Sequence, residues 1–222
     1  MTTESRVFTP EKRTFASLRR DLRIFAKYHL VRQPHRYPAP AEADMGVELL
    51  AFDLEAHVRA LQAHEPHFSS ETLGTVAYAG REHAITWVRN SAPADAPRLL
   101  VLSGVHGNEH AGIVCVPRIL ERLVALGQPR VAVGIVTPVN PIGAVEGSRF
   151  NGQGFDINRD FRRFETEEAR IVRRVIADFR PSLIVSLHEG PQDASFVFVN
   201  RSTPAGLAER AIAQLAARGV TL

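Results

Sequence analysis

The sequence contains a single cysteine, Cys115, among 222 residues. One cysteine excludes an internal disulfide and any metal site built from several cysteines. No apolar run approaches the roughly 20 residues that a membrane-spanning helix needs. The first residues, MTTESRVFTPEKR, also lack the apolar core of a secretory signal. We therefore expect a cytoplasmic protein that does not interact with membranes.

Hydrophobic residues make up 45% of the chain and charged residues 23%, the balance of a soluble globular protein. Two regions differ in character. Residues 1–65 are predicted to form a helical N-terminal extension, because apolar residues recur at helical spacing over 11–30 and 46–63. The proline-rich stretch QPHRYPAPAEAD (33–44) reads as a linker between these helices. Residues 66–222 are predicted to form a separate domain.

The positive charge is concentrated at the N-terminus. Residues 1–36 hold nine Lys and Arg against three Asp and Glu, whereas the rest of the chain is net negative. Such a segment could bind nucleic acid or another anionic surface. No nucleic-acid-binding motif accompanies it, so we favour the interpretation that it is the solvated face of a helix.

From Thr72 onward the pattern becomes that of an α/β domain. TLGTVAYAG and EHAITWVRN are predicted to pair as a hairpin that turns at Gly80–Arg81. Apolar strands are then expected at 99–103, 131–136, 183–187 and 196–199, and helices at 109–126, 165–179 and 204–218. Alternating strands and helices with continuously apolar strands indicate a mostly parallel mixed sheet with helices on both faces.

Polar residues follow three of the predicted strands. His106 and Glu109 come after strand 99–103, and His188 comes after strand 183–187. Sites in such sheets lie at the carboxyl ends of the strands, so we expect these side chains to converge at one edge. Two His and one Glu with an open fourth position form an arrangement typical of catalytic Zn²⁺. The sequence thus predicts one Zn²⁺ per chain.

The segment 138–163 is rich in glycine and is predicted to be an irregular loop after strand 131–136. It carries Arg149, Asn158 and Arg159. An Asn-Arg pair beside a metal would hold the carboxylate of a substrate, and a second Arg could stabilise the developing oxyanion. Asp156 is expected to orient the loop or a ligand rather than to bind metal itself.

Taken together, these motifs resemble those of the M14-type zinc carboxypeptidases and their relatives, the succinylglutamate desuccinylase/aspartoacylase group. The matching pieces, in order, are GVHGNE (104–109), NP (140–141), Arg149, DINRDF (156–161) and SLHE (186–189). The resemblance implies that 66–222 is a zinc carboxypeptidase-like catalytic domain. It implies metal ligation by His106, Glu109 and His188, carboxylate binding by Asn158 and Arg159, and assistance to the scissile carbonyl by Arg149.

The expected activity is hydrolysis of an amide bond in a peptide or N-acyl amino acid with a free carboxylate. NPIG and DINRDF favour a carboxypeptidase, whereas the short spacing between His106 and His188 favours an N-acyl-amino-acid deacylase of the desuccinylase type. These two alternatives stay open on the sequence.

One family feature is missing. The family's general acid/base is a Glu on a strand well downstream of the third ligand, but the only Glu after Glu189 is Glu209, inside a predicted helix. We therefore expect the domain to be C-terminally incomplete. Glu189 is the candidate for a local base. A third alternative is a zinc module that binds carboxylates without catalysis, because it lacks a base for proton transfer.

Overall fold

A computed structural model describes residues 52–127, 130–190, 196–200, 203–204 and 206–220, together with Phe15, Arg19, Leu22 and Ala26. The predicted helix 11–30 lies almost wholly outside the described residues, as do the linker 33–44, the start of the predicted helix 46–63 and most of the basic segment. The described residues from 52 onward form strands and helices of an α/β fold.

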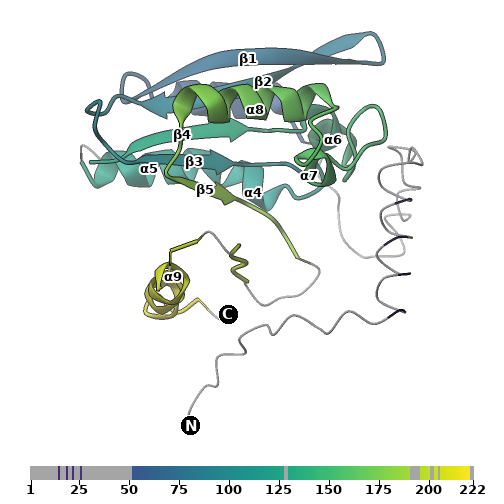
Figure 1. Cartoon of the computed structure of the whole chain (residues 1–222). Helices are drawn as coiled ribbons and strands as arrows, with labels where there is room; N and C mark the ends of the chain where they lie inside the picture. Colours follow the sequence, from purple (N-terminus) through teal and green to yellow (C-terminus); the bar gives the residue numbers. More distant parts are fainter. Residues whose placement is uncertain are drawn as a thin grey trace.

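The centre of the fold is a five-stranded mixed sheet in the order β1-β2-β4-β3-β5 (Figure 1). The strands are β1 (Phe68–Tyr78), β2 (Arg81–Asn90), β3 (Arg98–Leu102), β4 (Ala132–Thr137) and β5 (Leu183–Ser186). β3 pairs in parallel with both β4 and β5, whereas β2 pairs antiparallel with β1 and β4. The mixed sheet is confirmed, although its parallel part is confined to the three strands β4, β3 and β5.

The predicted hairpin forms, with its turn at Ala79–Gly80, one residue earlier than the predicted Gly80–Arg81. Ala79 and Gly80 have φ angles of 49° and 76°, the conformation of a tight two-residue turn between antiparallel strands. The register then pairs Tyr78 with Arg81 and Phe68 with Asn90. The hairpin extends the sheet on the side of β4 opposite to β3.

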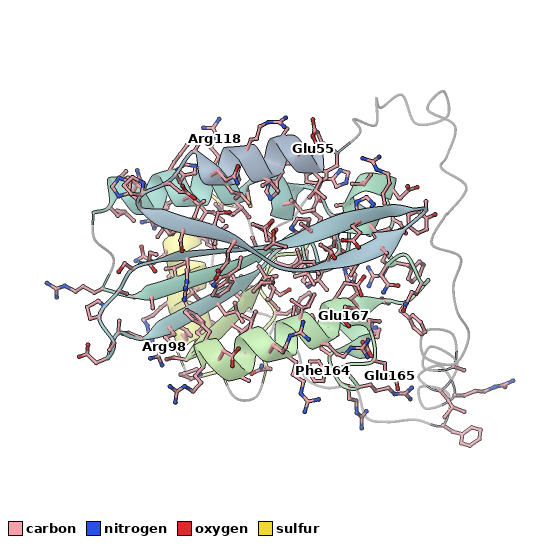
Figure 2. All side chains as sticks on the ribbon, turned by 90° about the horizontal axis from the view of Figure 1, so that it is seen from above. Glu55, Arg98, Arg118, Phe164, Glu165 and Glu167 are labelled. Carbon is pink, nitrogen blue, oxygen red and sulfur yellow. The ribbon has the colours of Figure 1, made fainter. Side chains whose placement is uncertain are left out.

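Helices cover both faces of the sheet, as predicted. Figure 2 shows helices α3 (Leu54–Gln62, with Glu55) and α5 (Val116–Ala125, with Arg118) on one side and α8 (Glu167–Phe179) on the other. Leu61, Val116 and Leu120 pack with one face of the sheet, and Ile171 and Val172 pack with the other. Two buried apolar layers therefore fix the position of every strand except at the β5 edge.

Helix boundaries follow local capping. α3 begins after Asp53, whose carboxylate accepts a hydrogen bond from the Ala56 amide at 2.8 Å, and α8 begins after Thr166. The predicted helix 109–126 is divided into α4 (Ala111–Val114) and α5, with Pro117 in the first turn of α5. Because proline has no amide hydrogen, it suits a helix start and interrupts a continuous helix.

The loop 138–163 is more ordered than predicted, since it contains helices α6 (Pro141–Glu146) and α7 (Ile157–Asp160). Asn140 and Asp156 cap them through hydrogen bonds to the amides of Gly143 and Arg159. The side-chain amide nitrogen of Asn140 is buried without a hydrogen-bond partner among the described residues. Both short helices lie at the same end of the sheet as the polar strand ends.

The C-terminal part departs most from prediction. β5 forms, but Ile184 and Val185 are 42% and 37% exposed instead of buried, because β5 is the edge strand. Residues 196–199 form no strand and are exposed. Helix α9 (Leu207–Ala216) forms within the predicted 204–218, has no buried residue and lies away from the sheet (Figure 1). In the described part of the chain, no helix is long and apolar enough to cross a lipid bilayer.

Candidate metal centre

The three parallel strands bring the predicted ligands to one edge. The chain passes from β3 to β4 through α5 on one face, and from β4 to β5 through α8 on the other. In the sheet, β3 therefore lies between β4 and β5, the two strands that follow it in the sequence. At its carboxyl end the connections leave the sheet toward opposite faces, which is the usual place for a binding site. His106 and Glu109 follow β3, and His188 follows β5. The structure brings these three side chains together, as expected.

Glu109 joins the two histidines. Its Oε1 lies 2.6 Å from Nδ1 of His106, and its Oε2 lies 2.8 Å from Nδ1 of His188. The two imidazole rings are 4.9 Å apart, centre to centre. One ligand atom from each of the three residues lies within 4.8 Å of the others, so the group could hold a metal ion. Two imidazoles and a carboxylate are a donor set that suits Zn²⁺.

The outer nitrogen of each histidine also has a partner. Nε2 of His106 lies 3.2 Å from Oδ1 of Asp156, and Nε2 of His188 lies 3.0 Å from Oγ of Ser186. A partner at Nε2 orients the ring and leaves Nδ1 as the ligand atom. Sequence reasoning did not identify Ser186. Its signal was weak, namely a hydroxyl residue two positions before His188, at the end of a predicted strand.

The negative charges around His106 favour the binding of a cation at this site. Burial alone would lower the pKa of His106, but hydrogen bonds to Asp156 and Glu109 outweigh it and raise the pKa above its ordinary value. Burial would raise the pKa of Glu109, yet hydrogen bonds from His106 and His188 bring it down to about 2. The pKa of Asp156 is also lowered, because contacts with His106 and Arg149 exceed the effect of its burial. Two ionised carboxylates thus flank the imidazole of His106.

The turn that carries His106 is closely packed on α6. A Cβ atom on Gly107 would overlap the backbone of Gly143 and Ala144, so only glycine permits this approach. The amide of Asn108 donates to the carbonyl of Ser148 at 3.1 Å. The buried backbone of this turn therefore has little freedom to move.

The three residues predicted to bind the substrate lie at different distances from this group. Arg149 is partly buried, with Nε 3.1 Å from Asp156 and NH1 3.6 Å from Glu109. Asn158 lines a pocket of about 390 Å³ together with the three predicted ligands. Arg159 is exposed and does not line this pocket. The structure thus brings Arg149 and Asn158 to the centre, whereas Arg159 is not among the residues that line the pocket.

Glu189 lies at the pocket but has a structural partner. Its backbone amide donates to Oε2 of Glu109 at 3.1 Å, and its own Oε2 accepts a hydrogen bond from the Ala111 amide at 3.1 Å. The carboxylate is therefore at the start of α4, beside the cluster rather than free within it. Because β5 ends at Ser186, the strict alternation of an extended strand does not apply to His188 and Glu189.

Comparison with known proteins finds similarity over the part of the chain that carries these residues. Residues 95–188 match the family described as the succinylglutamate desuccinylase/aspartoacylase catalytic domain. The metallo-carboxypeptidase from Burkholderia cenocepacia has the same fold, with a TM-score of 0.55 and 26% identity over 63% of this chain and 42% of that chain. Over this part the chain is similar to M14-type metallocarboxypeptidases and succinylglutamate desuccinylase/aspartoacylase proteins.

Other known proteins are similar over a comparable part of this chain. Carboxypeptidase 2 of Trichophyton rubrum is 26% identical over 132 residues, which cover 57% of this chain and 24% of that protein. A metallo-carboxypeptidase from Pseudomonas aeruginosa, 22% identical with a TM-score of 0.52 over 63% of this chain and 40% of that one, shares the fold. This chain spans about a quarter of the length of the curated carboxypeptidases it matches.

Proposed function

We propose that this chain provides the metal-binding part of a zinc-dependent hydrolase that cleaves an amide bond in a carboxylate-bearing substrate. The observation that carries this proposal is the group His106, Glu109 and His188, whose ligand atoms converge beside a pocket of about 390 Å³. Removal of a C-terminal residue from a peptide is the leading reaction. It is supported by the names of the curated relatives and of the solved structure from Burkholderia cenocepacia.

His106, Glu109 and His188 would hold the zinc ion. A bound Zn²⁺ supplies Lewis acidity at an amide carbonyl and lowers the pKa of water. With zinc bound, Asp156 would accept the proton at Nε2 of His106 and leave the lone pair of Nδ1 to the metal, and Ser186 would act in the same way on His188. The protein therefore supplies oriented ligands and two flanking negative charges.

Arg149, Asn158 and Arg159 are proposed to bind the substrate. Arg149 already faces Glu109 and Asp156, so its guanidinium is close to where a carbonyl oxygen would gain negative charge. The side-chain amide of Asn158 lies at the pocket and could donate to a carboxylate. Arg159 would have to turn inward to form a paired contact with the same carboxylate.

Glu189 is the candidate general base. Its carboxylate borders the pocket and accepts a hydrogen bond from the Ala111 amide. The substitution Glu189→Gln keeps an oxygen that can accept the Ala111 amide. We expect it to preserve zinc content and to reduce turnover by about 100-fold or more. Unchanged turnover in this variant would exclude Glu189 as the base.

A deacylase is the second candidate reaction, because the matching family description names a desuccinylase and aspartoacylase catalytic domain. A third candidate is a binding module without catalysis, favoured by the engagement of Glu189 with the Ala111 amide. Purified protein should be incubated with peptides and with N-acyl amino acids, and the products identified by mass spectrometry. Free C-terminal amino acids support the peptidase, small acids such as succinate support the deacylase, and no product supports the binding module.

Metal content tests the ligand assignment. We expect close to one Zn²⁺ per chain by elemental analysis and a strong reduction in His106→Ala. His67→Ala is the matched control, since His67 is an exposed histidine outside the cluster. Equal zinc in both variants would refute the assignment. The single free cysteine, Cys115, suits a reducing compartment, and we propose the cytoplasm as the location.

A further inference from the structure

A buried chain of side chains links helix α3 to the start of α4. His57 of α3 lies with Nε2 at 3.1 Å from Oγ1 of Thr137, at the end of β4. The Thr137 hydroxyl is 3.2 Å from Oγ of Ser103, just after β3, and the Ser103 hydroxyl donates to the Gly112 carbonyl at 2.7 Å. Gly112 lies three residues after Glu109, in α4.

The hydrogen bonds of this chain can run in only one direction. The Ser103 hydroxyl has one proton, which it gives to the carbonyl of Gly112, so its oxygen accepts from Thr137. Thr137 then has no proton left for His57, so Nε2 of His57 must be the donor. The imidazole is thereby fixed as the tautomer protonated at Nε2, and each member of the chain has its partner.

The same histidine is connected to the metal-binding turn by a second contact. The ring of Phe52 lies 5.6 Å from the ring of His57 and 5.4 Å from the ring of His110. His110 follows Glu109 directly, and its Nε2 lies 2.9 Å from the Ala144 carbonyl of α6. His57 is thus linked to the backbone that follows Glu109 in two ways. One link is the hydrogen-bonded series that ends at the Gly112 carbonyl, and the other is the ring of Phe52, which lies against His110.

We propose that His57 is a positioning residue for the metal centre. It holds the segment from Glu109 to Gly112 so that the carboxylate of Glu109 stays between His106 and His188. This inference rests on the proposed function, because it assumes that the three residues bind metal. α3 precedes residues 95–188, the part that matches the family. The α3 helix would therefore stabilise the site from outside the matched region.

The test is zinc affinity, measured by competition with a chromophoric chelator on the purified 222-residue protein. His57→Phe keeps an aromatic ring beside Phe52 but removes the donor to Thr137. We expect its zinc dissociation constant to rise about tenfold, the lower end of the range for residues that orient metal ligands. His57→Gln retains an N–H donor and should restore most of the affinity.

Two further variants separate positioning from general stability. Leu61→Ala removes a fully buried side chain of the same helix that takes no part in the chain. It should lower the unfolding midpoint in urea but leave the zinc dissociation constant unchanged. Thr137→Val removes the hydroxyl group at the centre of the series of hydrogen bonds. Because one unit is disrupted in either case, the double variant with His57→Phe should bind zinc no more weakly than the weaker single variant.

Each result decides between explanations. Unchanged zinc affinity in His57→Phe, or an equal loss in Leu61→Ala, would overturn the positioning role. Additive losses in the double variant would overturn the linked chain. If the unmodified protein binds no zinc, the proposed function itself fails, whereas unaltered affinity in the His57 variants of a zinc-binding protein rejects this inference alone.

Discussion

The buried imidazole of His57 should make the stability of the fold depend on pH. Burial lowers the pKa of His57 from 6.5 to about 4, so the folded protein keeps it neutral well below the pH at which the unfolded chain binds a proton. Between these two values only the unfolded state is protonated at this position. The free energy of unfolding therefore falls as the pH is lowered through this window, and the loss is complete below about pH 4.

The magnitude follows from the size of the pKa change. At about 1.4 kcal/mol per pKa unit, the change corresponds to ~3 kcal/mol between pH 7 and pH 4. His57 is nearly inaccessible to solvent, so screening by water does not reduce this contribution much. A loss of this size is a substantial fraction of the stability of a typical domain.

The comparison with His57→Gln isolates this contribution, because glutamine does not titrate. Urea unfolding should be followed by circular dichroism at several pH values from 7.5 to 4, with a chelator present to exclude metal binding. Other groups titrate equally in both proteins, so the difference in their unfolding free energies should shift by ~3 kcal/mol in favour of the variant as the pH falls. A difference that is constant with pH would refute the assignment of His57 as a neutral buried imidazole.

Three other substitutions test different parts of the structure. Gly107→Ala places a Cβ against the backbone of α6 and should reduce stability by about 2 kcal/mol, measured in urea, and zinc content with it. Asp156→Asn keeps an acceptor at Nε2 of His106 but removes a flanking charge, and should weaken zinc binding about 10- to 100-fold by chelator competition. Arg180→Gly relieves a left-handed backbone with φ of 48° at the end of α8 and should raise stability by about 0.5–1 kcal/mol, seen as a higher unfolding midpoint.

The convergence of the metal centre was predictable because it follows from topology. Apolar strands at 99–103, 131–136 and 183–187 indicated a parallel region, and parallel strands end at one edge. His106, Glu109 and His188 all follow such strands, so their approach required no knowledge of side-chain packing. The turn of the hairpin was equally accessible from Gly80, because local backbone chemistry determines it.

Contacts between distant residues were not predictable in this way. His57 and Thr137 are 80 positions apart, and neither residue type carries a pattern that indicates the other. The short helices α6 and α7 were missed because each has too few residues to show helical spacing of apolar positions. Their caps were visible in the sequence: Asn140 before Pro141, and Asp156 before Ile157.

Strand prediction was wrong at residues 196–199, for a physical reason. An alternating or continuous apolar run favours a strand only if the sheet offers it a partner and a covered face. Here β5 is the edge of the sheet, and its side chains Ile184 and Val185 are themselves exposed. Phe198 is 84% exposed. Intrinsic preference alone, without cross-strand contacts, does not produce a strand in this segment.

The metal centre combines two halves that are held very differently. His106 and Glu109 lie on a buried turn fixed by Gly107 against α6 and by the chain from His57 to Gly112. His188 follows the exposed edge strand and is held by Ser186 and by Glu109 itself. Because the carboxylate of Glu109 belongs to the buried half and contacts both histidines, it also restrains His188. The position of His188 therefore depends on the order of the turn after β3, and this is the route by which the proposed positioning by His57 would extend to the whole site.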